Sequence, residues 1–381
     1  MRSRVKDVDI TASTTGSPIL FPHEPDRGKD LAGRLGGKRP LFVCVIASTD
    51  TALIPGISAA GASVELIPFT AAADAEVLAH GAARCIAGLP CNPLGPPGPA
   101  LITLAALQLA AIPHVVVNAG CRIAPDAPYV KLGSAPGGLI TEGSAVPCAH
   151  ELFEAGLELG RDLAEQCDYI VSGESVPGGT TTALALLLAL GVAADGRVSS
   201  SLGGNAHDLK SRVARDALRH IDADAVASDP LAAVATLGDP MQAAVAGIVA
   251  GARRKGTPVL LAGGTQMIAV LALIHRLTSV GGYDLDDDSI AVATTRWVVE
   301  DPTADAVGLM RDVGHEPLLA TGLSFIASRY AGLRRYEEHL VKEGVGAGGA
   351  AVAAALAADV GCEALRERVE CLYEGILQST P

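Results

Sequence analysis

The feature that most constrains the fold is a regular alternation between short apolar runs and longer Ala- and Leu-rich stretches, which begins near residue 39. The apolar runs do not alternate polar and apolar residues, a pattern typical of strands in a parallel sheet with both faces covered. Right-handed crossovers through the intervening helices would wind such a sheet in both directions. We therefore predict an α/β fold: a doubly wound, mostly parallel sheet with helices on both faces. Strands are expected at residues 41–47, 64–69, 114–118, 169–172, 258–262, 290–294 and 318–322, and helices at 101–111, 148–166, 180–190, 241–255 and 267–277.

Composition divides the chain into three regions. Residues 1–38 are polar and rich in Gly, Pro, Ser and Thr, which predicts a flexible N-terminal arm. Residues 39–330 form the Rossmann-like α/β domain, and residues 331–381 are helical in pattern and form a C-terminal cap. Aromatic residues make up only 3% of the 381 residues, whereas glycine occurs 43 times. The core must therefore be built from closely packed Ala, Val, Leu and Ile.

The formal charge of -13 argues against nucleic acid or an anionic membrane as a partner. No apolar run is long enough to span a bilayer. The eight cysteines include no CxxC pair, so reduced thiols in a cytoplasmic protein are expected. No cofactor is predicted. An anionic small molecule remains compatible with the charge, because a local group of N–H donors can outweigh it.

The most informative segment is GESVPGGTTT, residues 173–182, which lies between an expected strand and an expected helix. The first N–H groups of a helix lack internal partners, and the helix dipole adds about half a positive charge there. Gly178 and Gly179 would let an anion approach the backbone, and Thr180 and Thr181 could donate further hydrogen bonds. The spacing matches the nucleoside triphosphate signature except that Gly179 occupies the lysine position, which favours a sugar monophosphate. The alternative is a plain helix start capped by threonine.

This segment resembles the turn GEMGIGNTT of nicotinate-nucleotide:dimethylbenzimidazole phosphoribosyltransferases, the CobT type. KEGVGAGGA at 342–350 resembles the segment GEGSGA of that family, and residues 238–273 resemble the stretch between the two. IPGISAAG (54–61), TAAADAE (70–76) and TTRW (294–297) match a divergent, uncharacterised CobT-like branch. The resemblance implies an α/β homodimer without a metal. Its implied reaction transfers ribose 5'-phosphate from nicotinate mononucleotide to a benzimidazole-type base during cobamide synthesis.

The resemblance also implies roles for individual residues. Glu343 would be the catalytic base, followed by glycines that let a flat ligand approach; without the resemblance it reads as a solvated carboxylate at a helix end. Glu174 would contact the ribose or its cation, with capping of the turn as the alternative. Lys210 would pair with the phosphate, although an exposed helix lysine has the same pattern. The remaining expected ribose- and base-binding residues are Gly264, Thr265, Asn92, Arg296, Gly344 and Gly346.

Departures from the family pattern leave other functions open. Val176 and Gly179 replace a family glycine and asparagine, and residues 263–265 replace Asp-Gly-Phe. The same fold could therefore bind or hydrolyse a nucleotide, or serve as a sensor without transferase activity. An NAD-dependent oxidoreductase is disfavoured, because no GxGxxG follows the first expected strand. Asp284 and residues 286–288 form an acidic cluster that lacks the spacing of a calcium loop and is interpreted as a solvated turn.

Overall fold

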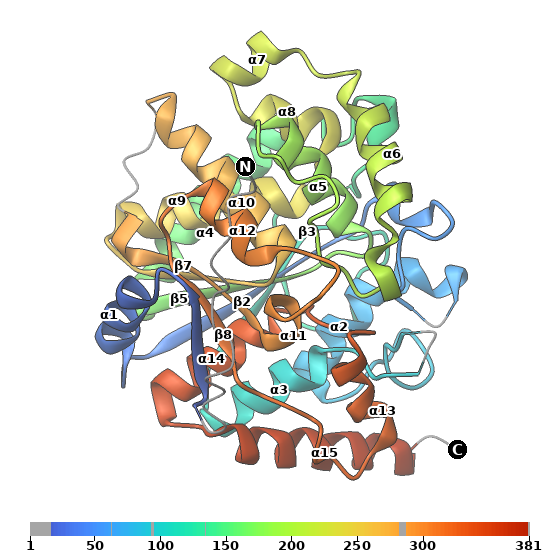
Figure 1. Cartoon of the computed structure of the whole chain (residues 1–381), viewed down its shortest axis with the longest axis vertical. Helices are drawn as coiled ribbons and strands as arrows, with labels where there is room; N and C mark the ends of the chain where they lie inside the picture. Colours follow the sequence, from blue (N-terminus) through green and yellow to red (C-terminus); the bar gives the residue numbers. More distant parts are fainter. Residues whose placement is uncertain (1–16, 62, 93–94, 134, 282–286, 380–381) are drawn as a thin grey trace, which may run out of the picture.

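The computed structural model describes residues 17–61, 63–92, 95–133, 135–281 and 287–379. Within these residues a single sheet of eight strands runs through the molecule in the order β1-β8-β7-β6-β5-β2-β3-β4 (Figure 1). Neighbouring strands are parallel except β1 and β8, which are antiparallel. The strands are β1 (Ile19–His23), β2 (Pro40–Ala47), β3 (His114–Gly120), β4 (Val130–Lys131), β5 (Tyr169–Ser175), β6 (Val259–Ala262), β7 (Ile290–Thr295) and β8 (Leu318–Thr321).

The direction of winding reverses between β2 and β5. From β2 the chain proceeds outward through β3 and β4, then returns past β2 to form β5 and continues to β8 in the opposite direction. This order confirms the predicted doubly wound sheet. In open α/β sheets the crevice outside the carboxyl ends of the two strands at such a reversal is the usual ligand site. A ligand site is therefore expected between the loops that follow β2 and β5.

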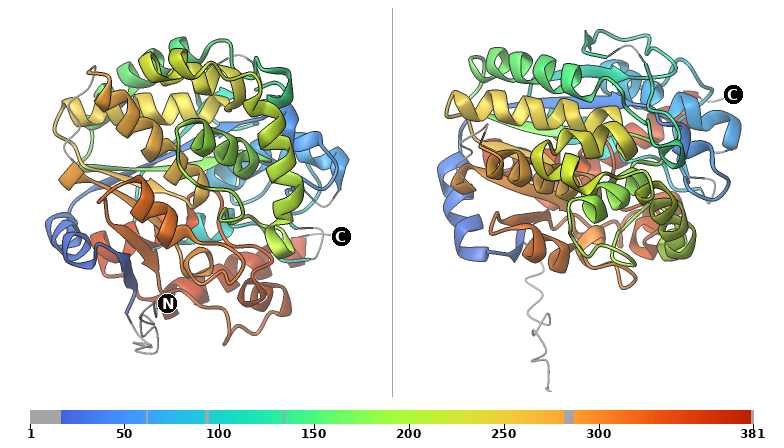
Figure 2. Two further views of the ribbon diagram at one scale, coloured as in Figure 1. Left: turned by 45° about the horizontal axis from the view of Figure 1, so that its top comes forward. Right: turned by 90° about the horizontal axis from the view of Figure 1, so that it is seen from above.

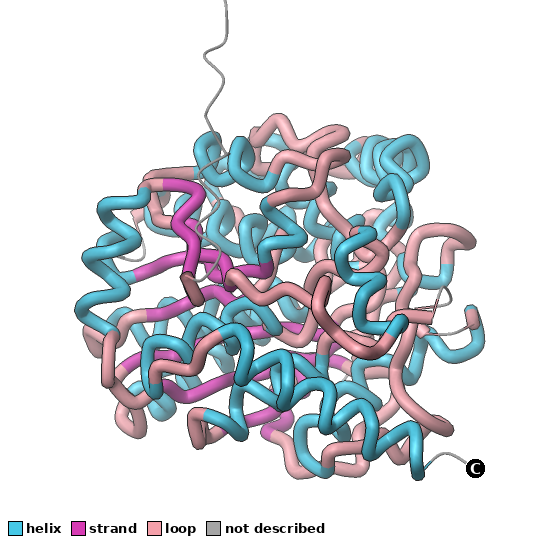
Figure 3. The backbone as a smooth tube through the Cα atoms, turned by 60° about the horizontal axis from the view of Figure 1, so that its bottom comes forward, coloured by secondary structure: helices cyan, strands magenta, loops and turns pink. Residues whose placement is uncertain are grey.

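Helices cover both faces of the sheet (Figure 3). They are α1 (Pro25–Leu35), α2 (Thr70–His80), α3 (Ala100–Leu109), α4 (Ala149–Ala164), α5 (Gly179–Ala189), α6 (His207–Leu218), α7 (Ala223–Ser228), α8 (Leu231–Leu237), α9 (Pro240–Arg254), α10 (Thr265–Ser279), α11 (Arg296–Val299), α12 (Ala306–Val313), α13 (Ala331–Arg334), α14 (Ala347–Ala358) and α15 (Cys362–Ser379). Successive β2 side chains enter opposite layers: Val43 joins the core with α4, α5, α9 and α10, and Phe42 joins the core with α3, α14 and α15.

Small residues bring the elements unusually close together. Helices α4 and α9 lie side by side over one face (Figure 2). A Cβ on Gly247 would lie 2.1 Å from the Phe153 carbonyl oxygen, and one on Gly160 would lie 2.2 Å from that of Ile248. On the other face α14 packs against β5, β6, β7 and β8, and its first eight residues are buried. The predicted C-terminal helical region is confirmed, and its inner helix is part of the core.

Two local expectations differ from the structure. Residues 17–38, assigned to a flexible arm, contain β1 and α1, and the Gly37 amide donates to the Leu356 carbonyl of α14. Residues 64–69, expected as a strand, form a 3₁₀ helix that contains Pro68, whose missing N–H cannot serve a sheet. Residues 1–16 of the expected arm lie outside the described residues. Among the described helices, none has the length and apolarity needed to cross a membrane.

Candidate active site

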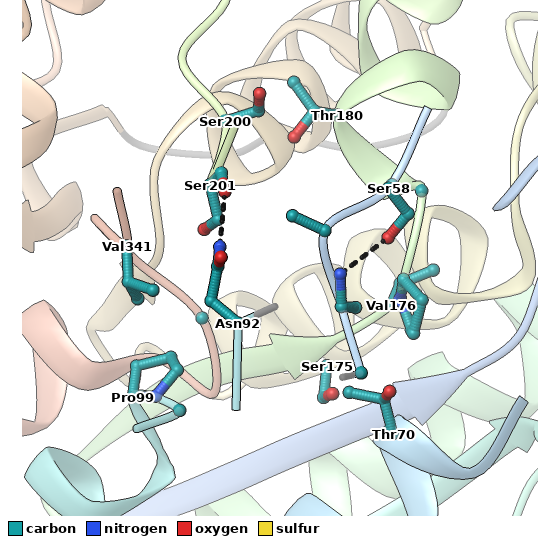
Figure 4. Close-up of a pocket in the computed structure, with 18 of the residues that line it drawn as sticks. Ser58, Thr70, Asn92, Pro99, Ser175, Val176, Thr180, Ser200, Ser201 and Val341 are labelled. Carbon is teal, nitrogen blue, oxygen red and sulfur yellow. Dashed lines mark hydrogen bonds between the residues drawn. The ribbon is translucent and has the colours of Figure 1, made fainter. Parts of the chain in front are cut away.

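A cavity lies at the point where the sheet reverses. The segment after β2 contributes residues 57–61, and the end of β5 with the start of α5 contributes residues 174–180. The other lining residues are 90–92, 98–99, 200–202, Thr70 and Asp74 of α2, Gln266, Val341, Glu343 and Gly344. Figure 4 shows Thr180 and Ser200 at one end of this cavity and Ser175, Thr70 and Pro99 at the other. The cavity therefore joins the two segments that carry the motifs singled out in the sequence.

The glycine-threonine turn at residues 178–181 leads into α5 as expected, but some of its amides already donate hydrogen bonds within the protein. Gly178 adopts a left-handed conformation with φ 79° immediately before α5, where a side chain would collide with Ala52. The Gly179 amide donates to the Val176 carbonyl and the Thr181 amide to that of Gly178. The amides of Gly178 and Thr180 donate to no acceptor among the described residues. Thr181 is buried outside the cavity lining, whereas Thr180 lines it. At the start of α5, two amides and the Thr180 hydroxyl are therefore the groups that could bind an anion.

Glu343 lines the cavity together with this turn and is held firmly. Its carboxylate accepts hydrogen bonds from the Thr294 hydroxyl at 3.0 Å and the Thr295 amide at 2.9 Å. The amides of Gly344 and Gly348 each donate to its other oxygen at 3.2 Å. Burial nevertheless raises the pKa of Glu343 to about 7, because these donors only partly offset desolvation. A carboxyl group poised near neutral pH and fixed in a cavity is suited to general-base chemistry.

Glu174, at the end of β5, is the second predicted carboxylate in the cavity. It is buried, and desolvation followed by the charges of Asp239 and Glu343 raises its pKa to about 8. Hydrogen bonds from the Val176 amide and the Gln266 side chain oppose this rise. A Cβ on Gly179 would lie 1.9 Å from the Gln266 Oε1 atom, so a side chain there would have to displace the Gln266 amide.

Asp74 on α2 is a third carboxylate in the cavity, and the sequence analysis assigned it no role. The Ser175 hydroxyl donates to its Oδ2 at 2.7 Å. Burial raises the pKa of Asp74 to about 7, against the effect of that hydrogen bond. The available signal was its position in TAAADAE, where two acidic residues occur among alanines.

A smaller cavity adjoins the first and shares Glu174, Thr180, Ser200 and Glu343 with it. Gly264 and Thr265, at the start of α10, line this second space as predicted. The Thr265 hydroxyl donates to the Ser199 carbonyl at 3.1 Å and accepts from the Ser199 amide at 3.0 Å. It thereby holds the serine segment 199–201 against the sheet end.

Two buried lysines lie behind this serine segment. Lys210 lines neither cavity; its ammonium group donates to the Ser200 hydroxyl and to the Asn205 carbonyl at 2.7 Å. Burial, together with the charge of Lys342, lowers the pKa of Lys210 to about 7. Lys342 lines the smaller cavity and pairs with Asp301 at 2.7 Å. Lys210, expected to pair directly with a phosphate, therefore contacts the cavity lining through Ser200.

Other predicted residues divide between the wall and its surroundings. Asn92 lines the cavity and donates to the Ser201 carbonyl at 2.9 Å, which Figure 4 marks. Gly344 also lines it, with φ 147°. Gly346 lies outside and packs against Gly173, where its hypothetical Cβ would be 2.8 Å from the Gly173 Cα. Arg296 is outside as well, because its guanidinium pairs with Glu300 at 2.9 Å.

Comparison with known proteins places this arrangement in a family. A family model described as phosphoribosyltransferase matches residues 100–284. A UPF0284 protein from Gloeobacter violaceus is 48% identical over 343 residues, 89% of each chain. The chain belongs to the UPF0284 family. A further UPF0284 protein, from Methanothermobacter thermautotrophicus, is 44% identical over 342 residues, which cover 88% of this chain and 93% of that one.

Solved structures show the fold of this UPF0284 protein. CobT from Thermus thermophilus matches with a TM-score of 0.59 and 20% identity, covering 91% of this chain and 89% of that one. A nicotinate-nucleotide-dimethylbenzimidazole phosphoribosyltransferase from the same organism matches with a TM-score of 0.55 and 21% identity over 90% and 88% of the two chains. The UPF0284 protein therefore has the CobT fold, and the resemblance identified from its motifs is confirmed.

The acidic residues of this UPF0284 protein do not gather into a metal site in the part of the chain that the structure describes. Of the acidic cluster noted in the sequence, Asp284 and Asp286 lie outside the described residues. The Asp288 carboxylate accepts a hydrogen bond from Arg27 of α1 at 2.8 Å.

Proposed function

We propose that this protein transfers ribose 5'-phosphate from nicotinate mononucleotide to a benzimidazole-type base, the reaction that supplies the lower-ligand nucleotide of cobamides. The observation that carries the proposal is Glu343. Its carboxyl group has a pKa near neutral, is fixed by four hydrogen bonds, and lines the same cavity as the helix start at Gly178–Thr180. The match to a phosphoribosyltransferase family model supports the same reaction class.

The phosphate is assigned to the start of α5. The amides of Gly178 and Thr180 have no acceptor within the described part of the chain, and the dipole of the 11-residue helix favours an anion there. Ser200 and Ser201 line the same end of the cavity. Lys210 contributes to the phosphate site indirectly, because its ammonium group orients the Ser200 hydroxyl. Glu174 then lies between the phosphate and the reacting carbon and contacts the ribose hydroxyls.

The proposed reaction needs one base and no external acid. The bond between the ribose C1' and the pyridinium nitrogen breaks, and its electron pair returns to the ring to give neutral nicotinate at that nitrogen. A lone pair on one imidazole nitrogen of the acceptor forms the new bond to C1'. The proton on the other imidazole nitrogen passes to Glu343. Glu174, once it is ionised above its pKa of about 8, supplies negative charge near the sugar as cationic character develops.

Replacing Glu343 with glutamine should lower kcat by about 10²–10⁴-fold, the usual contribution of a general base, with a smaller change in the affinity for nicotinate mononucleotide. The wild-type rate should rise with pH through about 7 as Glu343 loses its proton. The measurement is mass detection of nicotinate and ribotide after incubation with nicotinate mononucleotide and 5,6-dimethylbenzimidazole.

Glu367→Gln is the matched control, since Glu367 is an exposed residue of α15 and should leave the rate unchanged. An unaltered rate in Glu343→Gln would remove Glu343 from the mechanism. Release of nicotinate and free ribose 5-phosphate without ribotide would identify a nucleotide hydrolase instead. Ligand binding without any turnover would identify a binding protein.

A further inference from the structure

Asp74 sits at the end of the cavity opposite the proposed phosphate site. It lies one turn after Thr70 on α2, so the two side chains share a helix face. Figure 4 shows Thr70 and Ser175 together, away from Thr180 and Ser200. The Ser175 hydroxyl donates to Asp74 at 2.7 Å, which places the carboxylate at the same end.

One carboxylate oxygen of Asp74 is buried and accepts no hydrogen bond from the described residues. Its side chain is 5% exposed and its Oδ1 atom has no partner among the described residues. Nor does any described lysine or arginine pair with it in the structure. Burying a polar atom without a partner costs free energy, so such atoms in native proteins call for a ligand or another explanation.

Glu76, two residues further along α2, is a buried carboxylate that lines neither cavity. It is completely buried, and both of its oxygens are satisfied by backbone amides. The amides of Arg84 and Cys85 donate to Oε2 at 2.5 and 2.8 Å, and the Asp126 amide donates to Oε1 at 2.9 Å. Asp74 differs from Glu76 because it lines the cavity and one of its oxygens has no partner among the described residues. That oxygen is therefore the one that a ligand in the cavity would contact.

Asp74 and Glu343 both line this cavity. A flat ligand that fills the cavity can therefore present one edge to Glu343 and another to Asp74. Resting on the proposed function, we infer that Asp74 determines the acceptor: its Oδ1 accepts a hydrogen bond from an N–H or O–H substituent on the rim of the aromatic base. Bases with an amino or hydroxyl substituent are then preferred over bases whose rim is wholly apolar.

Matched pairs of bases test this preference. We would compare 4-aminobenzimidazole with 4-methylbenzimidazole and 5-aminobenzimidazole with 5-methylbenzimidazole, since amino and methyl groups have similar size. Two readouts are used with the full chain at pH 8, where Asp74 is mainly ionised: calorimetric binding of each base, and kcat/KM for ribotide formation from nicotinate mononucleotide. At least one amino base should exceed its methyl partner about tenfold or more, the effect of a hydrogen bond to a charged group.

Two variants separate Asp74 from the general shape of the cavity. Asp74→Asn can present an amide to the ligand and should reduce the amino preference to within about threefold or reverse it. Ser175→Ala removes the group that orients Asp74 and should reduce the preference partly. Asp162→Asn, on the exposed side of α4, should retain the full preference.

The outcomes distinguish this inference from the proposed function. An amino preference in binding without ribotide would support the role of Asp74 and contradict the transferase. Ribotide formation with equal use of amino and methyl bases, or a preference that survives in Asp74→Asn, would overturn the inference alone. Failure of every base to bind would overturn both.

Discussion

At the scale of single residues, the cavity contains three acidic side chains that are harder to ionise in the folded protein than in the unfolded chain. Asp74, Glu174 and Glu343 all line it, and burial raises the pKa of each, to about 7, 8 and 7. Such groups destabilise the folded state once the pH exceeds their normal range, because the unfolded chain ionises more readily. Binding sites commonly hold groups whose pKa is shifted in this way.

Glu174→Gln should therefore stabilise the protein increasingly as pH rises. In the unfolded chain a glutamate titrates near 4.3, whereas Glu174 in the fold has a pKa of about 8. Stability from the neutral carboxyl is complete below pH ~4 and is lost as the pH rises through about 8, and glutamine has no such loss. Melting temperatures measured from pH 5 to pH 9 should diverge, with the variant higher by roughly 2 °C or more at the alkaline end. Glu367→Gln should follow the wild type, and a constant difference for Glu174→Gln would contradict the argument.

At the scale of elements, the first helical layer depends on glycines where backbones touch. Gly156 and Gly160 of α4 face Gly247 and Gly251 of α9, and at each a Cβ would come within 2.5 Å or less of a carbonyl oxygen of the other helix. The side-chain-free surface lets the two helices pack in direct contact, and α9 in turn covers β2, β5 and β6 beneath the cavity. The lack of side chains at these four glycines therefore sets how closely α4 and α9 approach each other.

Gly247→Ala should lower the free energy of unfolding by about 1–3 kcal/mol, because the added methyl group meets the Phe153 carbonyl and forces the helices apart. Gly33→Ala is the matched control: Gly33 lies within α1, and a Cβ there would meet nothing within 4 Å. That change should be neutral or stabilising by up to about 1 kcal/mol through helix propensity. Urea denaturation compares the two. Equal effects would mean that α4 and α9 have room to separate.

At the scale of the whole molecule, one buried ion pair connects three distant segments. The Lys342 ammonium group donates to Asp301 at 2.7 Å and to the Asn205 side chain at 2.8 Å. Asp301 also accepts from Ser199 at 2.8 Å. Burial by itself would raise the pKa of Asp301, but hydrogen bonds from Lys342 and its neighbours hold it well below the normal range. The pair fixes the residue before Glu343 against the serine segment that lines both cavities.

Lys342→Met should cost about 3–5 kcal/mol, since it leaves the Asp301 charge buried without its cation. Lys255→Met tests the same substitution in the exposed pair with Glu165 and should cost at most about 1 kcal/mol. Urea midpoints at pH 7.5 give both values. A small effect at Lys342 would show that the hydroxyl and amide donors around Asp301 suffice without the ammonium group.

The sequence by itself determined the features that depend on neighbouring residues. The alternation of apolar runs with helical stretches indicates a parallel sheet, and each expected strand except 64–69 is present. The turn before α5 could be predicted because the strand, glycines and helix start are contiguous. Pro68 in the expected strand 64–69 was itself a signal against a sheet. Strand β1 was not found, since it is an edge strand whose only partner, β8, lies far away in the chain.

Only the tertiary structure decided which polar residues face the cavity. Asp74 and Ser175 are 101 residues apart, and Lys342 and Asn205 are 137 apart, so no local pattern links them. Local context could not distinguish Lys210, which is held behind Ser200, from Lys342, which lines the smaller cavity. Arg296 likewise follows β7 but turns outward to Glu300. Backbone conformation follows from short-range sterics, whereas the direction of a buried charge follows from the partners that the complete fold brings to it.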